Sequence, residues 1–158
     1  AERMPEADNA LRYEAAQRPD ITIQDSALTD ERQADLIAAA DVLVSLHRAE
    51  GYGLARAGAM GAGPIALGTA WSGNLDFMPA TNSVLVPYQL VPASTDLWNV
   101  PAGADWAEPD VSAAATEMQR LVSDQPWRDE LRATAFRDAG QRHSFEVTAE
   151  WLGRALEV

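Results

Sequence analysis

The hydrophobic positions of the chain change period several times, and each period predicts a different element. Residues 42–46 read Val-Leu-Val-Ser-Leu, a continuous apolar run typical of a strand buried on both faces of a parallel sheet. Residues 64–67 and 84–86 are short apolar runs that predict two more strands, and the β-branched run at residues 21–23 predicts another. Short strands that alternate with helical segments indicate an α/β fold.

Helical patterns fill much of the first half of the chain between these strands. Residues 6–18 are rich in Ala, Glu and Arg and predict a helix. A second helix should start within residues 28–31 and bury one stripe, composed of Leu36, Ile37 and Ala40. The small residues from Leu54 to Ala62 predict a third helix that packs closely against its neighbours.

Three further helices are expected after Asp110. Pro126 suits the first turn of the second of them, and Ser144 is a plausible N-cap for the third. The predicted inner face of the first consists of Val111, Ala114, Met118, Leu121 and Val122, and that of the third of Phe145, Thr148, Leu152, Ala155 and Leu156. Residues 87–109 hold four prolines and little periodicity, so we expect an irregular excursion there.

Composition narrows the class of protein. A length of 158 residues favours one domain, and a net charge of -12 disfavours a nucleic-acid partner because phosphate binding needs clustered Lys and Arg. Cysteine is absent, which excludes disulfides and thiolate metal sites and fits a cytoplasmic location. No apolar run approaches the ~18 residues that a spanning helix needs, so no transmembrane segment is expected.

The loop after the strand at residues 42–46 carries the candidate chemistry. The order strand, glycine-rich turn, helix presents backbone N–H groups and the positive end of a helix dipole to an anion such as a diphosphate. Gly51 and Gly53 would let the backbone approach that anion closely, and Glu50 could accept hydrogen bonds from sugar hydroxyls. The Gly-x-Gly spacing alone is equally consistent with a simple tight turn that binds nothing.

A longer stretch gives this loop a specific meaning. The segment from Asp41 to Leu54, DVLVSLHRAEGYGL, closely resembles the donor-site signature of GT-B glycosyltransferases of the family-4 type. The resemblance spans at least residues 21–110. It continues through Ala59-Met60, Gly63, Thr69, Trp71-Ser72-Gly73-Asn74, Asp76-Phe77-Met78, Asn82-Ser83, Val86-Pro87-Tyr88 and Trp106-Ala107-Glu108-Pro109-Asp110.

This resemblance implies a partial Rossmann-like parallel sheet with C-terminal helices, the donor-binding domain of a retaining hexosyltransferase. It places Glu50 at the position of the catalytic glutamate that contacts the donor sugar, and it implies neither a metal nor another cofactor. The donor would be a nucleotide-diphosphate sugar, with the acceptor held against a separate N-terminal domain. The donor-binding positions that it implies are His47, Arg48, Gly51, Tyr52, Gly53, Leu54, Ser72, Gly73 and Asn74.

Several of these residues also have a structural interpretation. His47 is either catalytic or, as is more common for a lone histidine at a strand end, held by structural hydrogen bonds. Arg48 either neutralises donor phosphate or pairs with Glu50, and Tyr52 either touches the sugar or packs under the loop. Among the tryptophans, Trp71 and Trp106 are candidates for sugar stacking, whereas Trp127 and Trp151 fit a core or an interface.

The chain departs from the family pattern at three places. A second glutamate of the family, which holds the nucleotide ribose, corresponds here to Gly58, and Gly63 is followed directly by Pro64, which indicates a register change of one residue. The first two strands and an Arg-Lys pair that clamps the diphosphate have no counterpart. In the Rossmann-like strand order 3-2-1-4-5-6, residues 21–23 would form the third strand and residues 42–46 the fourth. These two strands would not be neighbours in the sheet.

These departures leave two hypotheses open. Because those strands are missing and the chain begins with Ala1, we expect a fragment of a longer enzyme, inactive in isolation, whose sheet either closes by an unusual direct pairing or exposes apolar edges. The alternative is a degenerate, non-catalytic nucleotide-sugar-binding or assembly module.

Overall fold

The computed structural model describes residues 5–93 and 100–156, in which the chain divides into two compact units, residues 1–33 and residues 34–158. In the first unit, α1 (Pro5–Ala16) forms the predicted N-terminal helix. The predicted strand at residues 21–23 is wrong, because this segment has no regular secondary structure and forms no ladder. A run of three residues buries too little surface to hold a strand without a partner.

The predicted second helix is α2 (Asp30–Ala38), which crosses the boundary between the two units. Its expected buried stripe is only partly realised, because Leu36 is exposed whereas Ile37 and Ala40 are half-buried. Adjacent positions on a helix lie about 100° apart, so a helix that turns Ile37 inward turns Leu36 toward solvent.

The second unit contains the parallel sheet that the sequence predicts. Its strands β1 (Val42–Ser45), β2 (Ile65–Thr69) and β3 (Val84–Val86) lie in the order β1-β2-β3. Both ladders are parallel, with Val42 opposite Ile65 and Leu67 opposite Val84. The chain therefore has a mixed α/β fold with a three-stranded parallel sheet and C-terminal helices, which confirms the predicted partial Rossmann-like class.

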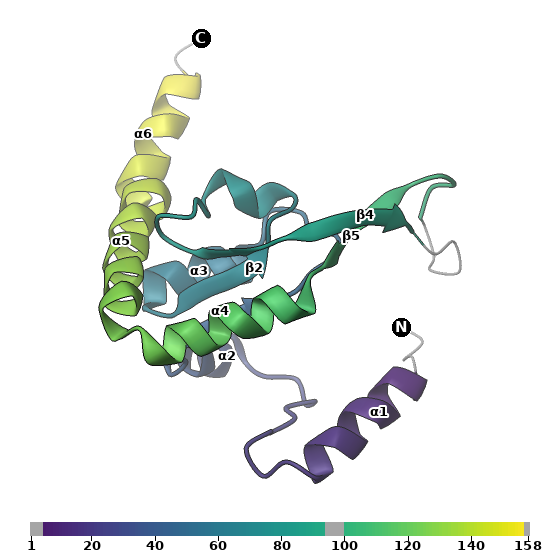
Figure 1. Cartoon of the computed structure of the whole chain (residues 1–158). Helices are drawn as coiled ribbons and strands as arrows, with labels where there is room; N and C mark the ends of the chain where they lie inside the picture. The colour runs from purple at the N-terminus through teal and green to yellow at the C-terminus, as the bar shows by residue number, and fades with distance from the viewer. Residues whose placement is uncertain (1–4, 94–99, 157–158) are drawn as a thin grey trace. The chain divides into compact units, whose positions relative to one another are not determined.

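Helices cover both faces of this sheet (Figure 1). On one face, Ile65, Leu67, Val84 and Val86 pack against Ala114 and Leu121 of α4 (Val111–Ser123). The other face packs Ala66 and Leu85 with Met60 of α3 (Leu54–Ala62) and with Ala135 and Ala139 of α5 (Gln125–His143). The alternating direction of side chains along β2 produces these two clusters.

A hairpin with strands at residues 88–92 and 105–109 lies where an irregular excursion was expected. The strands β4 (Tyr88–Pro92) and β5 (Asp105–Pro109) pair antiparallel, with Leu90 opposite Ala107, and extend beyond the sheet (Figure 1). The prediction failed because prolines were taken as breakers along the whole segment. Pro87 precedes β4, whereas Pro92 and Pro109 occupy strand ends, where a missing N–H interrupts the ladder least.

The three C-terminal helices occur where they were predicted, each with its own N-cap. Asp110 and Asp124 accept hydrogen bonds at the starts of α4 and α5, and Ser144 does so for α6 (Phe145–Leu156). Pro126 lies in the first turn of α5 as expected.

The predicted inner faces are less accurate than these boundaries. In α4, Ala114 and Leu121 are buried, but Val111, Met118 and Val122 are exposed. The α6 prediction is wrong, because this helix buries none of its residues and Phe145 is 83% exposed. The main packing partner of α6 is α5, which leaves the apolar face of α6 uncovered in the part of the chain that the structure describes. Within that part, no helix is long and apolar enough to cross a membrane.

Candidate functional site

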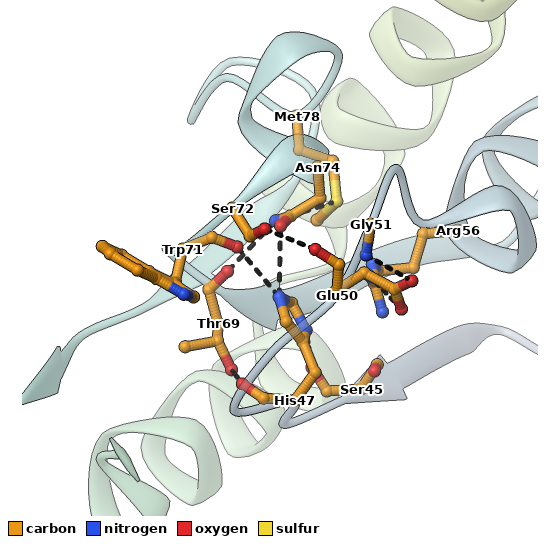
Figure 2. Close-up of polar contacts among 10 residues, drawn as sticks. All are labelled: Ser45, His47, Glu50, Gly51, Arg56, Thr69, Trp71, Ser72, Asn74 and Met78. Atoms are coloured by element: carbon orange, nitrogen blue, oxygen red, sulfur yellow. Dashed lines mark hydrogen bonds and ion pairs between the residues drawn. The ribbon is translucent and has the colours of Figure 1, made fainter. Parts of the chain in front are cut away.

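Two loops meet at the carboxyl edge of the parallel sheet. One follows β1 and contains Glu50 and Gly51, and the other follows β2 and contains Ser72, Gly73 and Asn74 (Figure 2). Because β1 and β2 are adjacent and parallel, their following loops emerge at the same edge. The structure thus brings together two of the segments on which the family resemblance depends.

The loops touch through backbone atoms. A Cβ added to Gly73 would lie 2.1 Å from the carbonyl oxygen of Gly51, so glycine is required for this approach. The Ser72 hydroxyl donates to the carbonyl oxygen of Glu50. Ser72 also has φ 79° and ψ -160°, a positive-φ conformation that is unfavourable for a residue other than glycine. Such strained backbone is common at ligand-binding sites, where surrounding contacts hold it in place.

Glu50 folds back over its own loop. Its Oε1 accepts from the Gly51 N–H at 3.1 Å, and its Oε2 accepts from Arg56 Nη2 at 3.0 Å. The side chain of Glu50 is 34% exposed, so its carboxylate lies at the boundary between the loop and solvent. The predicted catalytic glutamate is therefore held by one backbone amide and one guanidinium.

Sequence analysis missed Arg56, which lies in the first turn of α3 and is 2% exposed. Its guanidinium lies beneath Gly53, because a Cβ added there would meet Nη2 at 2.7 Å. A signal for it exists in the sequence: Arg56 shares one helix face with Ala59 and Met60, which are also buried. A charged residue within an apolar stripe requires a partner of opposite charge, and Glu50 is the nearest carboxylate before α3 in the sequence.

His47 is held by structural hydrogen bonds, as one of its two interpretations proposed. Its Nε2 lies 3.0 Å from the carbonyl oxygen of Trp71 and 3.1 Å from Oδ1 of Asn74, and Nδ1 lies 3.2 Å from the carbonyl oxygen of Ser45. Asn74 is buried and donates to the carbonyl oxygen of Thr69. The ring and this amide thereby join the ends of β1 and β2 beneath the loops (Figure 2).

Arg48 pairs with a carboxylate other than that of Glu50. Arg48 pairs with Glu108 of β5, with 2.6 Å between Nε and Oε2, and its guanidinium carbon lies 5.0 Å from the ring centroid of Trp106. The expected pair with Glu50 is wrong because Arg56 already occupies that carboxylate. Arg48 instead fixes the hairpin to the loop, and the Ala107 N–H donates to its carbonyl oxygen.

The remaining predicted site residues surround the loops at their surface. Tyr52 packs its ring 4.9 Å from that of Phe77, and Leu54 is largely exposed at the start of α3. Trp71 lies 5.2 Å from Tyr88, ring to ring. Trp151 is largely exposed and is not a core residue, whereas Trp127 packs against a core cluster.

Gly58 lies in α3, about one turn after Leu54. A Cβ added at Gly58 meets no atom within 4 Å, and the residue lines an open groove of about 320 Å³ between α3 and α5. Helix α3 starts after Gly53, which has φ 90° and supplies no side-chain cap. The first backbone N–H groups of α3 therefore receive no side-chain cap from Gly53. Neighbouring groups or a ligand can accept from them instead.

The arrangement combines amide donors, a carboxylate and a buried guanidinium within a few residues. These groups suit a ligand that is anionic at one end and rich in hydroxyls at the other. Among the described residues, no group of three or more His, Asp and Glu side chains could hold a metal ion. No protein-family model matches the chain, and no curated protein matches it at a significant level.

Proposed function

We propose that this chain is the donor-binding half of a retaining GT-B glycosyltransferase of the hexosyltransferase type. The observation that carries the proposal is the meeting of the Glu50 loop with the Ser72-Gly73-Asn74 loop at the carboxyl edge of adjacent parallel strands. Ligands of open α/β sheets bind at this edge. The resemblance of both loops to the family-4 donor signature gives the ligand its chemical class, a nucleotide-diphosphate sugar.

Within this proposal, each group has a defined task. The amides from Gly51 to Leu54 and the uncapped start of α3 bind the diphosphate, and Glu50 accepts hydroxyls of the donor sugar. His47 and Asn74 hold the two loops in register without contacting the reacting atoms. The acceptor would bind against a separate N-terminal domain, and catalysis would rest on positioning and on stabilising the departing nucleoside diphosphate.

Gly58 favours a second candidate, a non-catalytic nucleotide-sugar-binding or assembly module. The position that holds the nucleotide ribose in the family has no side chain here. Loss of such a carboxylate costs about 1 to 3 kcal/mol of binding, which corresponds to roughly a fivefold to 150-fold loss of affinity. In this second candidate the fold persists while donor affinity falls below what turnover requires.

The proposal is tested by saturation-transfer NMR with UDP, GDP, ADP and their common sugar conjugates. We expect one nucleotide family to receive saturation, including its sugar-ring protons. In the Glu50→Ala variant, the sugar-ring signal should fall relative to the base signal because the acceptor of the sugar hydroxyls is gone.

The matched control is Glu130→Ala, which removes an exposed carboxylate of α5 and should leave both signals unchanged. Transfer to the base without dependence of the sugar signal on Glu50 would favour the binding module. The absence of transfer from every ligand would contradict donor binding by this chain.

A further inference from the structure

The contacts of Glu50 are those of an anion bound to the loop. Its carboxylate accepts from the Gly51 N–H and from Arg56 Nη2, which are a loop amide and a buried cation (Figure 2). A phosphate oxygen would make the same two contacts, because it also accepts from amides and guanidinium groups. The side chain of Glu50 thus occupies the position where an anionic ligand would find its strongest donors.

Arg56 is incompletely satisfied by this partner. The guanidinium is buried, yet its Nε has no hydrogen-bond partner, and the ion pair uses Nη2 alone. A buried guanidinium with an unpaired N–H is unfavourable in a medium of low dielectric constant. An anion with several acceptor oxygens would satisfy more of its donors than one carboxylate oxygen does.

The surroundings allow Glu50 to move away while the loop stays in place. Ser72 holds the backbone carbonyl of Glu50, whereas the carboxylate lies at the surface and is partly exposed. A Cβ added to Gly51 meets no atom within 4 Å outside its two chain neighbours, so the rest of the chain does not enclose this residue. A change of side-chain rotamer would therefore release both donors from the Glu50 carboxylate.

We propose that Glu50 is an exchangeable internal anion and that Arg56 is the cation that binds a diphosphate in its place. A diphosphate displaces the carboxylate from the Gly51 amide and from Arg56, and the released carboxylate becomes available to the hydroxyls of the attached sugar. This inference rests on the proposed function and deepens it, because it couples binding of the diphosphate to presentation of Glu50. It also places one positive charge, that of Arg56, beside the bound diphosphate.

The test is isothermal titration calorimetry of the full chain with inorganic pyrophosphate at constant ionic strength. Glu50→Gln keeps the size of the side chain but removes the competing charge, so it should bind pyrophosphate at least about tenfold more tightly than the wild type. The control is Glu130→Gln, which changes the net charge equally but lies on α5, and it should bind as the wild type does.

A double variant assigns the gain to Arg56. Glu50→Gln combined with Arg56→Met replaces the buried pair by groups of similar shape without leaving an unpaired charge, so the chain is expected to fold. It should lose the tenfold gain. Tight binding by the double variant, equal affinities of the two glutamine variants, or no binding by Glu50→Gln would each overturn the inference.

Failure of the inference is distinguishable from failure of the proposed function. Glu50-dependent transfer to sugar-ring protons in the wild type, without a pyrophosphate gain in Glu50→Gln, would leave the function standing and remove the exchange. A pyrophosphate gain without binding of any nucleotide sugar would leave an anion site that is not a donor site.

Discussion

Glycine at position 58 leaves α3 without a carboxylate at the groove that it forms with α5. The backbone there is helical, and the space beside it is open. Nothing in the packing of α3 therefore requires glycine at this position. A glutamate would fit, and it would stand where the family resemblance implies the contact to the nucleotide ribose.

Gly58→Glu is expected to raise the affinity for the preferred nucleoside diphosphate by about tenfold or more, because a carboxylate accepts two ribose hydroxyls. The measurement is calorimetric titration with the nucleotide that gives the strongest NMR transfer. Gly58→Ala is the matched control, since both variants gain about 0.5 to 1 kcal/mol of stability by removing a helical glycine. Equal affinities of the two variants would show that ribose is not bound beside α3.

The site was partly predictable because its anchor residues lie in contiguous sequence. Glu50, Gly51 and the segment from Ser72 to Asn74 could be assigned to strand ends, and adjacent parallel strands then bring them together. The ion pairs were not predictable in the same way. Arg48 pairs with Glu108 because the hairpin, which the sequence did not predict, brings Glu108 to it. Arg56 lies in a stretch whose small residues suggested packing alone.

At the scale of elements, the start of α6 shows how a cap shapes local electrostatics. The Ser144 hydroxyl accepts from the Val147 N–H, and Glu146 lies in the same first turn. The Glu146 backbone amide and the Ser144 side chain both hold the pKa of the Glu146 carboxyl below its ordinary value. The positive end of the helix dipole acts in the same direction.

Ser144→Ala should therefore raise the pKa of Glu146 toward its ordinary value, as measured by NMR titration of its side-chain carboxyl. Because the folded-state pKa is lowered, this interaction stabilises the helix start above the ordinary pKa and is lost as pH falls through the folded value. Ser123→Ala is the control, since that hydroxyl lies at the end of α4 and should leave the titration unchanged. An unchanged Glu146 titration in Ser144→Ala would remove Ser144 as a cause.

The accuracy of the predicted elements follows how locally each one is determined. The bounds of α3 and β3 agree with the structure because Gly53 and Gly63 flank α3, and Pro87 ends the continuous apolar run of β3. The run at residues 21–23 has strand propensity, but a strand needs a partner that its own sequence does not specify. The predicted burial of α6 was wrong for a related reason. A helical pattern identifies an apolar face, but it does not identify the surface that covers this face.

At the scale of the second unit, β1 is an edge strand with β2 as its neighbour in the part of the chain that the structure describes. Val44 lies in this strand and is 38% exposed. Natural proteins protect such edges with charges or covering elements, because unpaired strand edges promote association between chains.

Val44→Lys should accordingly reduce concentration-dependent association of the chain, as followed by sedimentation velocity over a range of protein concentrations. A lysine on an edge strand keeps its own hydrogen bonds to β2 but disfavours the approach of a second strand, because a charge would be desolvated between them. Val44→Thr is the matched control, since it preserves the β-branched shape without adding a charge, and it should associate much as the wild type does. If the lysine variant associates as strongly as the wild type, β1 is not the surface responsible, and the exposed face of α6 becomes the surface to vary next.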